Sequence, residues 1–346
     1  MNILFVGDIF GSAGRKIVRE HIGHVRKANN VDLTIINSEN AAGGFGVTPQ
    51  IAEDLFDLGA DVLTTGNHVW DKRELIDYMN SAKAESHERA RRILRPANFQ
   101  PGLPGYGVYE GITQGGVPYA VINLGGRVFM NATNDPFHAI NDILADIQAK
   151  VIVVDFHAEA TSEKVAMGWH LDGRVTAVLG THTHVPTADE RVLPGGTAFQ
   201  TDVGMSGPYD SVIGVETELV LNKFLTGIQA KIILVDFHAE ATSEKVAMGW
   251  HLDGRVTAVL GTHTHIPTAD ERILPGGTAY QTDVGMSGPY DSVIGVEKEL
   301  VLNRFLTGMS GKFEAATGNP KMCAALISCD PMTGKAHRIQ RLMLGE

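Results

Sequence analysis

The chain has 346 residues, of which 43% are hydrophobic, and its formal net charge at pH 7 is −11. This length and composition allow one large or two medium globular cores. The acidic balance, without a stripe rich in Lys and Arg, argues against double-stranded nucleic acid as a partner. No run of about 18 apolar residues predicts a membrane-spanning helix, so no membrane partner is expected. The two cysteines, Cys323 and Cys329, are too few for a disulfide framework and favour a cytoplasmic location.

Short apolar runs alternate with amphipathic stretches along most of the chain. Apolar runs predict strands at residues 2–7, 33–36, 62–63, 120–124, 151–154 and 175–179. Apolar residues at helical spacing predict helices at residues 15–26, 48–58 and 72–80, the second opening with Thr48-Pro49. The stretch 101–116, rich in Gly and Pro, predicts a loop. The alternation predicts an α/β fold with layered sheets flanked by helices.

A long tandem duplication dominates the second half of the chain. Residues 147–227 recur at 228–308, with an offset of 81 residues. The copies differ at seven positions, which are Val151/Ile232, Val153/Leu234, Val185/Ile266, Val192/Ile273, Phe199/Tyr280, Thr217/Lys298 and Lys223/Arg304. Removing one copy of 81 residues from 346 leaves 265, a length that suits a single domain.

We therefore predict one domain over residues 1–346, in which one copy completes the fold begun by residues 1–146 and the other is surplus. The surplus copy would pack as an appendage, stay partly unfolded, or exchange with another protomer by domain swapping.

Polar side chains follow directly after the predicted strands. They are Asp8, Glu39, Asn40, Asn67, His68, His157, His182 and His184. Ligands of α/β sheets bind beyond the carboxyl ends of the strands, so we expect these side chains to lie close together. Carboxylate, amide and imidazole groups without a thiolate suit Fe or Mn, with Zn as the alternative. Two such ions can clamp the attacking and leaving oxygens of a displacement at phosphorus and activate a water.

Single members of this set have simpler interpretations. Asp8 alone could be a turn or cap residue, and His157 alone would more often be a buried histidine with a structural partner. The pair His182 and His184 is stronger, because a spacing of two puts both rings on one face of a strand. The glycines of residues 7–14 lack the spacing of a nucleotide-binding loop, so tight turns beside the metal site explain them better.

Five segments carry a resemblance to a known family. They are residues 7–11 (GDIFG), 37–44 (NSENAAGG), 65–68 (TGNH), 155–164 (DFHAEATSEK) and 180–187 (GTHTHVPT). The chain resembles the calcineurin-like metallophosphoesterases and, within them, the YmdB-like 2′,3′-cyclic-nucleotide phosphodiesterases. The broader superfamily usually has Asp-x-His at the first strand. The segment Asp8-Ile9-Phe10 lacks that histidine, and Asn40 looks like its replacement.

The resemblance implies roles for these residues. One ion would be held by Asp8, Glu39, Asn40 and His184. A second ion would be held by Glu39, Asn67, His157 and His182, with Glu39 bridging the two. His68 would protonate the leaving oxygen, a role that suits an imidazole.

The resemblance further implies hydrolysis of cyclic phosphodiesters by a cytoplasmic homo-oligomer. Two alternatives stay open. One is a phosphomonoesterase with the same metals, and the other is a metal-containing regulatory protein whose catalysis is weak or lost.

The duplication repeats the histidines but not the other ligands. His238, His263 and His265 are the second-copy equivalents, whereas Asp8, Glu39, Asn40 and Asn67 each lie outside the repeat. One chain can therefore complete a single two-metal site. We predict that the first copy supplies the histidines, because it follows residues 1–146 directly. The second copy could supply them instead, because it leads directly into the C-terminal segment 313–344. In a third arrangement, the histidines come from both copies.

Overall fold

The computed structural model describes residues 1–81, 88–131, 133–209, 211, 213, 230–309 and 311–345. The chain forms two compact units. Unit 1 comprises Met1–His184 and Glu190–Pro208, and unit 2 comprises Val185–Asp189 and Tyr209–Glu346. Within the described ranges, no helix has both the length and the apolar character needed to span a membrane.

Unit 1 begins with a parallel sheet covered by helices. Its strands, in spatial order, are β1 (Ile3–Val6), β3 (Leu33–Asn37), β4 (Val62–Thr64) and β5 (Ile93–Leu94). The helices are α1 (Gly11–Ala28), α2 (Pro49–Asp57), α3 (Arg73–Ser81) and the single turn α4 (Glu88–Arg91). Thr48 caps α2 by accepting a hydrogen bond from the Ile51 amide at 3.3 Å, which confirms the predicted start of that helix.

A second sheet of six strands completes unit 1. Its spatial order is β10 (Arg191–Val192), β11 (Ala198–Gln200), β9 (Ala177–Thr181), β8 (Val151–His157), β7 (Pro118–Gly125) and β6 (Val108–Ile112). The central strands are parallel, and β6 and β10 are antiparallel edges. The prediction of a loop over 101–116 is wrong for β6, because Val108, Tyr109 and Ile112 favour a strand and the Gly and Pro residues lie mainly on either side of it.

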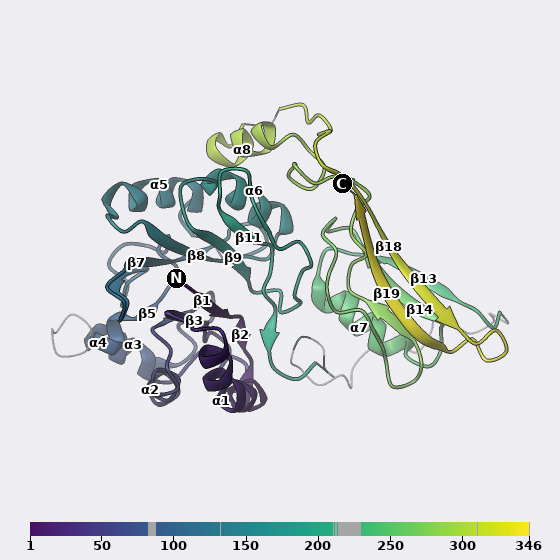
Figure 1. Cartoon of the computed structure of the whole chain (residues 1–346), viewed down its shortest axis with the longest axis horizontal. Helices are drawn as coiled ribbons and strands as arrows, with labels where there is room; N and C mark the ends of the chain where they lie inside the picture. Colours follow the sequence, from purple (N-terminus) through teal and green to yellow (C-terminus); the bar gives the residue numbers. More distant parts are fainter. Residues whose placement is uncertain are drawn as a thin grey trace. The chain divides into compact units, whose positions relative to one another are not determined.

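The two sheets of unit 1 pack face to face. Buried side chains of the first sheet meet those of the second in one apolar layer, formed by Leu33, Ile35, Val62 and Leu94 with Tyr119, Val121, Val153 and Ala177. The next residues along the same strands, Ile36 and Leu63, point the other way and pack under α1, α2 and α3. The helices α5 (Pro136–Asp146) and α6 (Thr161–Leu171) lie over the outer face of the second sheet (Figure 1). The predicted layered α/β fold is confirmed.

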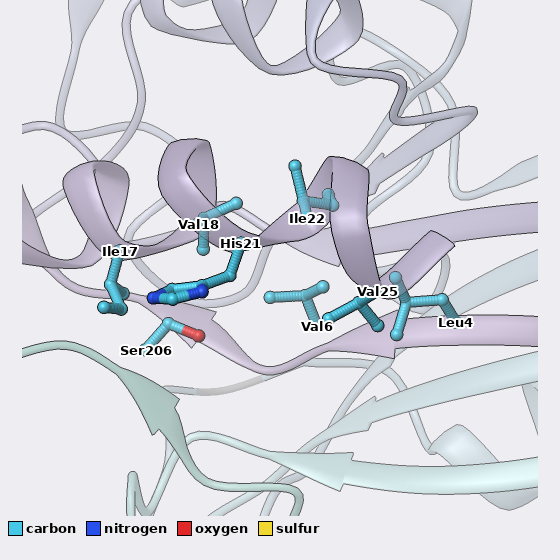
Figure 2. A pocket seen from close by; sticks show the side chains of 8 residues that line it. All are labelled: Leu4, Val6, Ile17, Val18, His21, Ile22, Val25 and Ser206. Atoms are coloured by element: carbon cyan, nitrogen blue, oxygen red, sulfur yellow. The ribbon is translucent and has the colours of Figure 1, made fainter. Parts of the chain in front are cut away.

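A short parallel pair of strands joins residues 205–206 of the first copy to residues 8–9, which follow β1. The strand β12 (Met205–Ser206) pairs with β2 (Asp8–Ile9), so that Met205 lies opposite Asp8. Beside it, α1 and β1 enclose a small apolar pocket, into which the side chains in Figure 2 point. The pocket is lined by Leu4, Val6, Ile17, Val18, His21, Ile22, Val25 and Ser206. It contains no carboxylate and none of the predicted metal ligands.

Unit 2 repeats part of unit 1. Its four-stranded sheet has the spatial order β13 (Leu234–His238), β14 (Ala258–Thr262), β16 (Ala279–Gln281) and β15 (Arg272–Ile273), of which β15 is antiparallel, with α7 (Thr242–Leu252) packed beside it. These elements correspond to β8, β9, β11, β10 and α6, in the same register. The C-terminal part adds β17 (Gly288–Pro289), β18 (Pro320–Cys329), β19 (Ala336–Gly345) and α8 (Lys298–Thr307).

The two copies differ in what surrounds their sheets. In unit 1, β7 flanks β8, whereas β13 is an edge strand of its sheet. Val153 in β8 is fully buried, but its counterpart Leu234 in β13 is 62% exposed. The sheet face of β14 and β16 packs against Ile327 and Ile339 of the β18–β19 hairpin, not against a parallel sheet. The same sequence therefore buries its apolar face against two different partners.

The segment 185–189 of the first copy pairs with residues 266–270 of the second inside unit 2. The Ala188 amide donates a hydrogen bond to the Pro267 carbonyl at 2.9 Å, and the Ala269 amide donates one to the Pro186 carbonyl at 2.8 Å. Thr187 and its counterpart in the second copy face each other between these two bonds in an antiparallel bridge.

Candidate metal centre

The single-copy candidates lie directly after strands of the first sheet, Asp8 at the start of β2 and the others in turns. Asp8 follows β1, Glu39 and Asn40 follow β3, and Asn67 follows β4. Asp8 and Glu39 are fully buried. Gly66 is required here, because a Cβ atom at that position would lie 2.2 Å from Cδ2 of the His157 ring. The strand ends therefore bring buried carboxylates and an amide to one edge of the sheet, as the sequence predicts.

One ring nitrogen of His157 is the meeting point of several groups. Nε2 of His157 lies 2.6 Å from Glu39 Oε2, 3.1 Å from Asn67 Oδ1 and 3.0 Å from His182 Nδ1. Ligand atoms of Glu39, His157 and His182 all lie within 4.8 Å of one another, which is close enough for one ion. The structure brings together the four residues that the resemblance implies for one of the two ions.

A neighbouring group involves the other predicted ligands. Nε2 of His184 lies 3.0 Å from Nδ2 of Asn40 and 3.8 Å from Oδ1 of Asp8. The backbone amide of His182 donates a hydrogen bond to the other Asp8 oxygen at 3.2 Å. Rotation of the Asn40 amide would present its oxygen at the same position, and oxygen is the atom with which an amide binds a metal. Asp8 thus connects this group to the first one.

Two carboxylate oxygens belong to fully buried side chains beside the imidazole rings. Among the described residues, Oδ1 of Asp8 has no hydrogen-bond partner, and Oε2 of Glu39 has Nε2 of His157 at 2.6 Å, which satisfies it only while that nitrogen carries a proton. An unsatisfied carboxylate oxygen in the interior is costly unless a cation or a donor meets it. Both oxygens face imidazole nitrogens in an arrangement typical of ligands around an ion. The oxygen and nitrogen donors therefore fit divalent metal ions.

The electrostatics of the site reflect the same crowding of charge. Burial alone would raise the pKa of Glu39, but the adjacent His157 outweighs it and lowers that pKa to about 2. Burial would likewise lower the pKa of His157, but the Glu39 carboxylate raises it to about 9. Burial raises the pKa of Asp8. In the metal-free protein, a proton on His157 takes the place that a cation would occupy beside Glu39.

His182 and His184 are held by a turn with an unusual backbone. Both residues have positive φ angles, 98° and 67°, in the region that favours glycine. Such strain persists only where the surroundings fix it, and it occurs often at functional sites. Their counterparts His263 and His265 have nearly the same angles, 106° and 68°. The turn is therefore a property of the local sequence and not of the metal ligands around it.

Further residues orient the ligands and were not predicted. The Thr181 hydroxyl donates to Oδ1 of buried Asp155 at 2.7 Å and lies 2.9 Å from Nδ1 of His157, which leaves Nε2 of His157 facing the site. Glu159 Oε2 lies 2.9 Å from Nε2 of His182. The Asp-x-His spacing and the nearby Glu159 were visible in the sequence, but only the fold shows that Asp155 acts on His157 through Thr181 and that Glu159 contacts His182.

His68 lies beside the cluster. Its backbone amide donates to Glu39 Oε1 at 2.5 Å, and its ring Nδ1 lies 2.8 Å from Asp71 Oδ2. The ring packs edge-on against Phe45, with centroids 5.1 Å apart. Asp71, which was not predicted, fixes the ring so that Nε2 is left for another partner.

The second-copy histidines lie in unit 2. His238 ends β13, and His263 and His265 follow β14. Nδ1 of His265 lies 2.8 Å from the Ile294 carbonyl. The residues that complete the cluster in unit 1 lie outside the repeat, so unit 2 by itself has no equivalent of Asp8, Glu39, Asn40 or Asn67.

Comparisons with known proteins identify the family of this chain. The model of the YmdB-like protein family matches residues 4–232 and again residues 228–342. A 2′,3′-cyclic-nucleotide 2′-phosphodiesterase of Bacillus subtilis (strain 168) is 44% identical over 238 residues, which cover 68% of this chain and 87% of the relative. A crystal structure of a hypothetical protein from Thermus thermophilus is 31% identical and superposes with a TM-score of 0.54, covering 100% of both chains. This chain belongs to the YmdB-like protein family.

Proposed function

We propose that unit 1 is a metal-dependent phosphodiesterase that hydrolyses 2′,3′-cyclic nucleotides. The observation that carries this proposal is the convergence of buried Asp8, Glu39 and His157, in which Oδ1 of Asp8 has no hydrogen-bond partner among the described residues. The name of the Bacillus relative supplies the substrate class. Asp8, Glu39, Asn40 and His184 would hold one ion, and Glu39, Asn67, His157 and His182 the other. Fe or Mn suits this donor set best, and Zn is the alternative.

The residues around the cluster have different roles in the proposed reaction. Divalent ions bound there supply positive charge for the phosphoryl oxygens and lower the pKa of a water. Thr181 and Glu159 keep the rings of His157 and His182 in the orientation that binds metal. His68, held through Nδ1 by Asp71, donates a proton from Nε2 to the leaving ribose oxygen. The cytoplasmic location and the homo-oligomeric state stay predictions from the sequence.

Hydrolysis of 2′,3′-cyclic AMP by the purified chain reconstituted with Mn²⁺ tests the proposal. We expect turnover in the wild type and its loss in Asp8→Asn, which keeps the shape of the side chain but removes its charge. A chromophoric phosphate monoester serves as the competing substrate. Turnover of the monoester alone would identify a phosphomonoesterase. Two bound ions without turnover of either substrate would contradict the proposal and indicate a regulatory protein.

Metal loading should release protons in a defined pH window. Because the pKa of His157 is raised to about 9, its ring carries a proton at pH 7.5 in the metal-free protein and must lose it to bind an ion. We expect about one proton more to be released per chain at pH 7.5 than above pH 10, where the ring is already neutral, while a metal-bound water loses a proton at both pH values. Calorimetric titration in two buffers of different ionisation enthalpy measures this number. A release that does not change between pH 7.5 and 10 would contradict the protonated state of His157.

A further inference from the structure

The second copy keeps two histidines whose ring nitrogens face each other at the edge of its sheet. His238 ends the edge strand β13, and His263 follows β14, the strand paired with it. Nε2 of His238 lies 3.0 Å from Nδ1 of His263. His238 is exposed, and the side chain of His263 is 42% exposed. The pair lies outside the metal centre of unit 1 and is accessible to ions in solution.

The other nitrogen of each ring has a partner that determines where the hydrogen lies. The Thr262 hydroxyl donates its hydrogen to Asp236 Oδ1 at 2.7 Å, so it can only accept from Nδ1 of His238 at 2.9 Å. Glu240 Oε2 lies 2.8 Å from Nε2 of His263, and a carboxylate accepts. Both outer nitrogens are therefore donors. In their neutral forms, the two inner nitrogens, Nε2 of His238 and Nδ1 of His263, both carry a lone pair.

Two lone pairs at 3.0 Å repel each other unless a cation lies between them. A proton can take this place only if one ring becomes charged, whereas a metal ion binds both neutral rings. Two imidazole nitrogens, each about 2.1 Å from one ion and about 90° apart, lie about 3.0 Å from each other. The observed separation therefore matches two neighbouring positions of an octahedral ion, with solvent available for the remaining positions.

We propose that His238 and His263 form a second metal site, in unit 2, for an octahedral divalent transition ion such as Ni²⁺. Asp236, through Thr262, and Glu240 orient the two rings. Because the pair lacks the carboxylate and amide ligands of unit 1, it holds a single ion that exchanges with solvent. The inference does not depend on which reaction unit 1 catalyses.

Equilibrium dialysis of the full chain against Ni²⁺, with bound metal counted per chain, tests the site. We expect His238→Ala/His263→Ala to bind one ion fewer than the wild type. The control His337→Ala removes a different exposed histidine of unit 2, from β19, and should bind as the wild type does. Each single variant should lose the ion as well, since one imidazole cannot chelate. Equal counts in wild type and double variant would show that only a proton lies between the rings and would overturn the proposal.

A variant of Glu240, which orients the ring of His263, tests whether the two rings bind one ion together or single histidines bind ions separately. Glu240→Gln can present its amide oxygen to Nε2 of His263 but lacks the charge, so we expect about a 10- to 100-fold weaker Ni²⁺ affinity at this site. Retained helix content in circular dichroism shows that the variants fold, and hydrolysis by unit 1 should stay at the wild-type rate. Unchanged affinity in Glu240→Gln together with unchanged ion counts in both single variants would mean that either ring alone holds the ion, which contradicts the chelate.

Discussion

His157→Ala is expected to lower hydrolysis of 2′,3′-cyclic AMP by more than about 100-fold, whereas His238→Ala leaves it unchanged. The two residues occupy the same position of the repeat and carry the same local sequence. His157 is fully buried against Glu39, with 2.6 Å between Nε2 and Oε2, while His238 is exposed at the edge of unit 2. Loss of a residue that only orients a ligand already costs about 10- to 100-fold in metal affinity or activity, so loss of a ligand should cost more.

The comparison of the two variants decides which copy serves the site. Steady-state kinetics with Mn²⁺-loaded protein, together with bound metal per chain, is the measurement. The pairs His182→Ala/His184→Ala and His263→Ala/His265→Ala extend the same comparison to the His-Thr-His turn. Loss of activity in His157→Ala and in His263→Ala/His265→Ala would show a hybrid of the two copies. Full activity in every single-copy variant would show that the copies are interchangeable, and the assignment of the first copy would be wrong.

Lys164→Met is expected to destabilise unit 1 by about 3–5 kcal/mol, because it leaves a buried carboxylate without its cation. Nζ of Lys164 lies 2.6 Å from Oδ2 of Asp202, and both side chains are almost fully buried. Burial alone would raise the pKa of Asp202, but Lys164 and the hydrogen bonds from Thr183 and Gly204 lower it. The same carboxylate accepts hydrogen bonds from the Thr183 amide and hydroxyl at 3.2 and 2.8 Å. Loss of the lysine should therefore displace Asp202 and also loosen the turn of His182 and His184.

The repeat supplies the matched control for this variant. Lys245 and Asp283 form the corresponding pair in unit 2, at 2.7 Å and equally buried. Urea unfolding can be followed through Trp169 in unit 1 or Trp250 in unit 2, with the other two tryptophans replaced by Phe. We expect Lys164→Met to shift only the Trp169 transition and Lys245→Met only the Trp250 transition. Equal shifts of both transitions by either variant would show that the two units unfold together.

Most of the fold of unit 1 could be predicted because its signals are local. The strand ends at Asp8, Glu39 and Asn67 follow short, mainly apolar runs, and parallel strands present their carboxyl ends at one edge. The edge strand β6 was not predicted, because Gly and Pro on either side of it are stronger local signals than the alternation of apolar and polar residues within it. Asp155 escaped because a carboxylate inside an apolar strand has no local signature of its role, which depends on Thr181 of the neighbouring strand.

The fate of the duplicated segment could not be predicted from local sequence. The two copies form the same strands, the same helix and even the same strained turn, as the φ angles of His182 and His263 show. The two copies differ in their tertiary contacts. β8 gains β7 as a neighbour and an apolar sheet beneath it, while β13 stays at an edge with Leu234 exposed. Identical local propensities leave this choice to packing and chain connectivity.

The pairing of residues 185–189 with 266–270 has a pseudo-twofold symmetry. With the repeat offset of 81, Pro267 is the counterpart of Pro186, and Ala269 is the counterpart of Ala188. Both hydrogen bonds therefore run from the amide of the alanine in one copy to the carbonyl of the proline in the other. Each copy thus presents the same surface to the other, which is the pattern of an isologous contact in a homodimer. A chain with one copy would carry this surface without an internal partner, so the duplication encloses within one polypeptide a contact that two identical polypeptides could otherwise make.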